Sequence, residues 1–156
     1  MDFEPGWAIL AGLIGGGAMA AILYMGIFML PNQMKMNLFK LLGTMMVPAG
    51  AMAYVAGAMM HGVMSIVFGI IHASAYAAFG LETGLIAWGL LFGVVHWMVV
   101  GMGLGMMPTM HPAIRRGDMQ APGAYAMSYP RMTAMGFFML HLVFGVVMAA
   151  VYEAIV

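Results

Sequence analysis

Charged residues are missing from four long stretches of this sequence, and this feature limits the possible folds more than any other. No Lys, Arg, Asp or Glu occurs in residues 5–34, 41–81, 83–114 or 132–152. Each stretch is longer than the roughly 20 apolar residues that a helix needs to cross a bilayer. Charged residues make up only 6% of the chain, whereas a soluble domain has about 25%. The sequence therefore predicts an integral membrane protein.

The breaks between the apolar stretches predict one domain, residues 1–156, with four transmembrane helices. Pro31 and Pro108 end the first and third helices, because proline cannot continue a helix. A glycine-bounded turn at residues 80–84 separates the second helix from the third. The predicted fold class is an all-α four-transmembrane-helix bundle. Its predicted spans are residues 7–30, 49–79, 85–107 and 132–156, and its long connections are residues 31–48 and 108–131.

The positive charges predict how the bundle sits in the membrane. All five cations lie in the two long connections, so the positive-inside rule places these connections in the cytoplasm and both termini outside. We expect a multi-pass protein of the plasma (inner) membrane. An apolar pattern from Met34 to Met45 also predicts a short helix on the membrane surface. The cations are Lys35, Lys40, Arg115, Arg116 and Arg131.

The two halves of the chain share a pattern that indicates an internal repeat. The alignment of Pro31 with Pro108 is a shift of 77 residues, and that of His61 with His141 is a shift of 80. We therefore expect two tandem helical hairpins related by a pseudo-two-fold axis along the membrane normal, as in transporters built from parallel repeats. The coinciding pairs include Gly12 with Gly89, Gly16 with Gly93, Val63 with Val143 and Val67 with Val147.

Small residues recur at helical spacing and predict close contacts between helices. Three Gly-x-x-x-Gly motifs occur within the spans, and such motifs let membrane helices approach closely. Besides the lipid bilayer, we therefore expect a homo-oligomer or a larger membrane complex as partner. A net charge of zero without a basic run gives no reason to expect nucleic acid. The motif residues are Gly12, Gly16, Gly89, Gly93, Gly101 and Gly105.

Each span carries one histidine or methionine close to the expected middle of the bilayer. Polar groups at this depth usually point into the bundle and mark function. Imidazole suits several transition metals, and thioether selects Cu(I), whereas no carboxylate is expected in the core of the bundle. The sequence therefore predicts a metal site, with copper as the favoured ion. Its predicted ligands are Met19, His61, His96 and His141.

Other histidines and methionines, in this methionine-rich chain, are candidates for a secondary site or a relay. The simpler interpretation is that the methionines fill gaps in the core. The histidines would then make hydrogen bonds between helices. The secondary candidates are His72, His111, Met102, Met106, Met107 and Met110.

Three functions remain open from the sequence. The first is a copper-binding membrane protein, and the second is a b-type haem protein with His61 and His141 as axial ligands. The third is a non-catalytic accessory subunit of a larger complex, with no cofactor. We do not expect an enzyme and name no catalytic residue, because the chain shows no nucleophile beside a base, no paired carboxylates and no phosphate-binding loop. The chain has no cysteine, which excludes thiolate chemistry.

Overall fold

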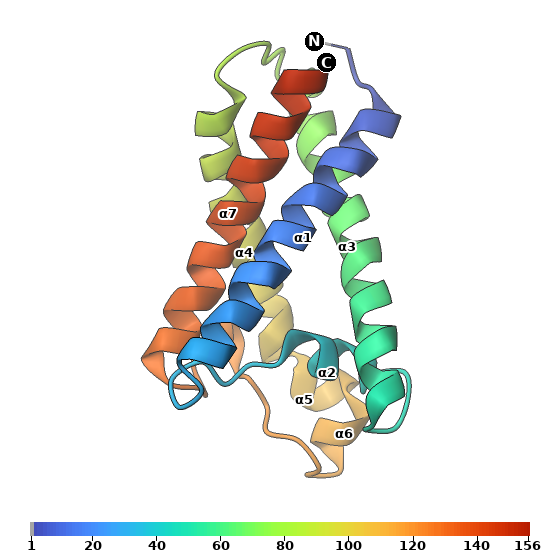
Figure 1. Ribbon diagram of the computed structural model, residues 1–156, viewed down its shortest axis with the longest axis vertical. Coiled ribbons are helices and arrows are strands. Elements are labelled where there is room, and N and C mark those ends of the chain that lie inside the picture. Colours follow the sequence, from blue (N-terminus) through green and yellow to red (C-terminus); the bar gives the residue numbers. More distant parts are fainter. Residues whose placement is uncertain (1) are drawn as a thin grey trace.

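Long apolar helices dominate the structure, a computed structural model that describes residues 2–156. Within these residues the chain has no strand, and four of its helices are long and apolar enough to cross a membrane (Figure 1). The prediction of an all-α protein with four helices long and apolar enough to span a membrane is confirmed, and each of these helices begins and ends within two residues of its predicted bounds. The four are α1 (Pro5–Met29), α3 (Ala51–Ala78), α4 (Leu85–Gly105) and α7 (Arg131–Ile155).

The two ends of the bundle differ in what they carry. Both chain termini and the turn between α3 and α4 lie at one end, here called the terminal end (Figure 1). The two long connections lie at the other end, here called the connection end. The connections contain the short helices α2 (Leu38–Gly43), α5 (Met107–Met110) and α6 (Pro112–Arg115), and the 3-10 turn η1 (Ala124–Ala126).

The turn from α3 to α4 is built from glycine and capped from α7. Gly80 and Gly84 have φ angles of 64° and 67°, a left-handed conformation that glycine adopts without strain. The Glu153 carboxylate then accepts hydrogen bonds from the N–H groups of Gly84 and Leu85, at 2.8 and 3.1 Å respectively. An acidic side chain at a helix N-terminus satisfies open N–H groups and complements the helix dipole. Glu153 therefore fixes the start of α4.

The four long helices pack in an open row. α1 packs against both α3 and α7, and α7 packs against α4, whereas α3 makes few backbone contacts with α4 or α7. A full pseudo-two-fold arrangement would relate the α1–α7 pair to the α4–α3 pair. These two pairs differ in how closely they approach, so the pseudo-symmetry and the repeat behind it stay a prediction.

Glycines mark the places where helices approach most closely. A Cβ atom on Gly12 would lie 3.0 Å from the Cα atom of Gly69, on α3. A Cβ atom on Gly93 would lie 2.7 Å from the carbonyl oxygen of His141, and one on Gly89 would collide with the backbone of Gly145. These positions suit glycine because membrane helices gain stability from close backbone contact. Gly16 faces the Ser65 side chain, while Gly101 and Gly105 face Tyr125 and Ala124 near η1.

The first connection folds inward. The short helix that the apolar pattern predicts is present as α2, but it packs against α3 and buries Leu41 and Leu42, which are 2% and 5% exposed. Gly43 and Gly57 make this docking possible, because the backbone of the partner helix occupies the space that a Cβ atom would need. α2 thus forms part of the interior.

Candidate metal-binding cavity

A cavity of about 380 Å³ lies inside the bundle toward the connection end. Side chains from α1, α2, α3, α4, α5 and α7 line it, and most of them are apolar. Its volume falls within the range of roughly 300–1,000 Å³ that is usual for ligand pockets. All four residues predicted at mid-bilayer line this one cavity: Met19, His61, His96 and His141.

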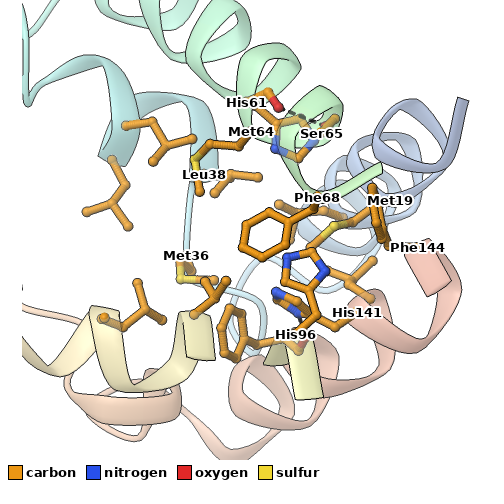
Figure 2. Close-up of a pocket in the computed structure, with 18 of the residues that line it drawn as sticks. Met19, Met36, Leu38, His61, Met64, Ser65, Phe68, His96, His141 and Phe144 are labelled. Atoms are coloured by element: carbon orange, nitrogen blue, oxygen red, sulfur yellow. Dashed lines mark hydrogen bonds between the residues drawn. The ribbon is translucent and has the colours of Figure 1, made fainter. Parts of the chain in front are cut away.

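The cavity exists because aromatic side chains fill the space between α3 and α4 in only one half of the bundle. Toward the terminal end, Tyr76 stacks on Phe92 with ring centroids 5.4 Å apart, and His72 meets the same Phe92 ring at 5.8 Å. Phe68 is the last ring of this series, and it lines the cavity. Beyond Phe68, toward the connection end, Met64 and His61 of α3 also line the cavity (Figure 2).

His141 is oriented by its own helix. Its Nδ1 atom lies 2.7 Å from the Phe137 carbonyl oxygen, one turn earlier in α7. A carbonyl oxygen only accepts, so Nδ1 carries the proton of the neutral ring and Nε2 carries the lone pair. Histidines that bind metals almost always donate their other ring N–H in this manner, because the bond fixes the ring and raises its basicity. The ring is therefore held ready to act as a ligand.

His96 is held by rings and not by hydrogen bonds. Its ring stacks on Phe68 with centroids 3.6 Å apart and planes at 20°, and the His141 ring meets it edge-on at 4.8 Å and 87°. The buried Nδ1 atom of His96 has no hydrogen-bond partner within residues 2–156. A buried polar atom without a partner is uncommon and calls for a functional explanation. Figure 2 shows both histidines beside Phe68 at one side of the cavity.

His61 lies on a different part of the wall. Its Nε2–H donates to the Gly16 carbonyl oxygen at 3.1 Å, and its ring faces Phe39 of α2, with centroids 5.8 Å apart. Phe68, the α3 residue level with His96, is seven residues further along, which is roughly 10 Å on a helix. The sequence predicted that the three imidazoles lie at one level. In the structure, His61 instead lies nearer the connection end than His96 and His141. Among the described residues, no three His, Asp or Glu side chains are close enough to hold one metal ion.

Methionine sulfurs add to the ligand inventory of the cavity. Met19 is 8% exposed and lies beside Phe68 and Phe144, on the same side as His141 (Figure 2). Among the secondary candidates, Met102 is 55% exposed and lies outside the cavity. Met106, Met107 and Met110 line its end nearest α5, and Met36, Met45 and Met64 line other parts of the wall.

The two remaining histidines lie outside the cavity and differ in their surroundings. His72 is buried on the terminal side of His96, with ring centroids 5.8 Å apart. His111 joins the two long connections, because its Nε2–H donates to the Leu41 carbonyl oxygen at 2.8 Å. Its Nδ1 accepts the N–H of Ile114 at 3.4 Å, so both ring nitrogens have protein partners.

Phe68 lines the cavity but was not among the predicted site residues. It falls on the same helical face as His61 and His72, so its spacing already placed it between the two histidines. The part of the wall that α2 contributes carried no such signal in the sequence, because it depends on contacts between distant segments.

Compared with known proteins, the chain matches no family model, and neither a curated protein nor a solved structure shows significant similarity to it.

Proposed function

We propose that this protein binds a soft metal ion, Cu(I), within the membrane through His96, His141 and Met19. The observation that carries the proposal is the state of His141, whose Nδ1–H is committed to a backbone carbonyl while its Nε2 lone pair remains for a ligand beside His96. His61 and the methionines near α5 would serve as further ligands along the same cavity.

The chemistry of the wall favours copper over harder ions. Imidazole nitrogen and thioether sulfur are good ligands for Cu(I), which also accepts low coordination numbers. None of the described residues that line the cavity is acidic. Magnesium, calcium and manganese prefer carboxylate and other oxygen ligands, so this wall suits them poorly.

The geometry of the histidine pair also bears on the haem alternative. Two axial imidazoles on one iron would hold their nitrogens about 4 Å apart, from metal–nitrogen distances of about 2 Å, and their ring centroids further apart still. The centroids of His96 and His141 are only 4.8 Å apart and the rings are nearly perpendicular. This pair therefore suits two neighbouring positions on one ion better than two opposite positions. A haem would have to use His61 with His141 instead.

The proposal is tested on protein purified from its own membrane. Elemental analysis and an optical spectrum come first, since haem gives an intense Soret band and Cu(I) gives none. Cu(I) affinity is then measured by competition with a chromophoric chelator. We expect His96→Leu and His141→Leu to weaken binding strongly and Met19→Leu to weaken it less. His72→Leu and Met102→Leu are matched controls outside the cavity and should bind like the wild type.

Two outcomes would overturn the copper proposal. A Soret band without copper would favour the haem protein. Absence of both metal and haem, together with wild-type behaviour of the two histidine variants, would favour the accessory subunit, whose role depends on its surface.

A further inference from the structure

A second pocket, of about 570 Å³, lies at the connection end and differs in character from the cavity. It is formed by the chain around α2, by the start of α3 and by the loop before α7. Ammonium, amide and hydroxyl groups line this pocket, whereas most of the residues that line the candidate metal-binding cavity are apolar. The polar lining residues are Lys35, Asn37, Lys40, Tyr54, Gln120, Ser128 and Tyr129.

The charge of this pocket is positive. Lys35 and Lys40 both line it, and none of its described lining residues is acidic. Asp118, which is close by in the sequence, forms its ion pair with Arg116, with Nε and Oδ2 2.8 Å apart. Neither lysine has an ion-pair partner within residues 2–156. An anion entering the pocket would therefore meet two uncompensated ammonium groups.

The neutral groups of the pocket are held in place by hydrogen bonds. Asn37 accepts from the Tyr24 hydroxyl at 2.9 Å and from the Lys40 N–H at 3.0 Å, which positions the lysine-bearing segment. Gln120 donates through Nε2 to the Ser128 carbonyl oxygen at 2.9 Å. Burial raises the pKa of Tyr129, so its phenol stays neutral and brings no negative charge.

The pocket borders the start of α3, whose outward face is apolar and exposed. Tyr54, one of its lining residues, is 42% exposed near the start of α3. On the adjoining outward face of the same helix, Met52, Val55 and Met59 are 66%, 51% and 69% exposed. A phospholipid requires such a combination, because its headgroup needs polar partners at the point where its acyl chains meet an apolar helix.

We infer that this pocket binds the phosphate headgroup of an anionic phospholipid. Lysine is a common phosphate ligand, and basic pockets at the ends of membrane helices bind anionic headgroups. Leu41 lines both this pocket and the metal-binding cavity, so a bound lipid would steady α2 from outside. The inference stands on the lysines and the exposed helix face, and it does not depend on copper.

The test measures lipid-dependent stability of protein stripped of lipid in a neutral detergent. We expect phosphatidylglycerol to raise the unfolding temperature, and phosphatidylcholine to leave it unchanged. The double variant Lys35→Gln with Lys40→Gln should lose this rise. The matched control, Arg115→Gln with Arg131→Gln, removes the same charge from the same end but not from the pocket, and should keep it. Native mass spectrometry should show a lipid adduct in the wild type and the control only.

Each contrary result has a definite meaning. An equal rise with inorganic phosphate at the same concentration would assign the pocket to a soluble anion and overturn the lipid. An equal loss in the arginine control would show general electrostatic attraction and overturn the site. Cu(I) affinity of the lysine variant should match the wild type, so failure of this inference is distinguishable from failure of the copper proposal.

Discussion

Phe68 stacks face to face on His96, with ring centroids 3.6 Å apart and planes at 20°. The contact joins α3 to α4 at a level where their backbones make few contacts. It also forms the boundary between the aromatic half of the interior and the cavity. One aromatic side chain therefore connects the stability of the bundle to the orientation of a proposed metal ligand.

Replacement of Phe68 should weaken copper binding without removing a ligand. Phe68→Leu takes away the stacking that orients His96, and aromatic pairs are worth about 0.5–1.5 kcal/mol beyond their buried area. We expect Cu(I) affinity to fall by several-fold, as measured by chelator competition. Phe92→Leu is the control, since Phe92 belongs to the same aromatic layer but does not line the cavity. Equal affinity in both variants would remove the positioning role of Phe68.

The glycine contacts predict a contrast between two alanine substitutions on α4. Gly89→Ala places a methyl group against the backbone of Gly145, and such overpacking costs about 1–3 kcal/mol. Gly103→Ala meets nothing within 4 Å, so it should be neutral or stabilise the helix by roughly 0.5–1 kcal/mol. Thermal unfolding in detergent measures both. A Gly89→Ala protein as stable as the wild type would show that α4 and α7 pack more loosely than described.

The cap that α7 provides for α4 should contribute measurably to stability. Glu153→Ala removes the acceptor for two N–H groups at the start of α4, and the loss of a cap costs about 0.5–2 kcal/mol. Glu153→Gln keeps an oxygen acceptor, so we expect an intermediate effect. Hydrogen exchange at Gly84 and Leu85 gives a local readout, and unchanged protection in Glu153→Ala would contradict the cap.

His111 should act as a structural link between the connections. His111→Leu leaves the Leu41 carbonyl and the Ile114 N–H without their partner, at a cost of about 1–3 kcal/mol for a buried polar group. We expect faster proteolysis within residues 109–130 and an unchanged amount of copper per folded protein. A loss of copper with normal proteolysis would instead make His111 a ligand.

The orientation in the membrane can be read directly, because the chain has no cysteine of its own. Asn32→Cys and Thr83→Cys introduce single thiols at the connection end and the terminal end. The positive-inside rule predicts that a membrane-impermeant maleimide added to intact cells labels the second variant only. Labelling of the first variant alone would reverse the predicted topology.

The sequence predicted the long helices well, because crossing a bilayer requires length and apolarity and little else. It also predicted that Met19, His96 and His141 would lie inside, since polar groups avoid lipid. Its account of His61 was less accurate, because depth was inferred by counting residues and by alignment with His141. Helices that cross at an angle do not keep equal residue counts at equal depth.

The sequence did not predict that α2 packs against α3 in the interior, and the reason is different. An apolar stripe shows that one face of a helix avoids water, but the same stripe can face lipid or protein. The choice depends on Gly43 and Gly57, which allow α2 to dock on α3. The periodic pattern of apolar residues within one helix does not show such complementarity between two distant segments.

The one-sided support of α3 has a further mechanical consequence. α1 and α2 hold this helix along one flank, while α1, α7 and α4 form a continuous block without it. An outward rotation of α3 about its contact with α1 would therefore separate Phe68 from His96 and Tyr76 from Phe92. Because α1, α7 and α4 contact one another without α3, such a movement would leave these three helices in place, and the aromatic rings between α3 and α4 are what opposes it.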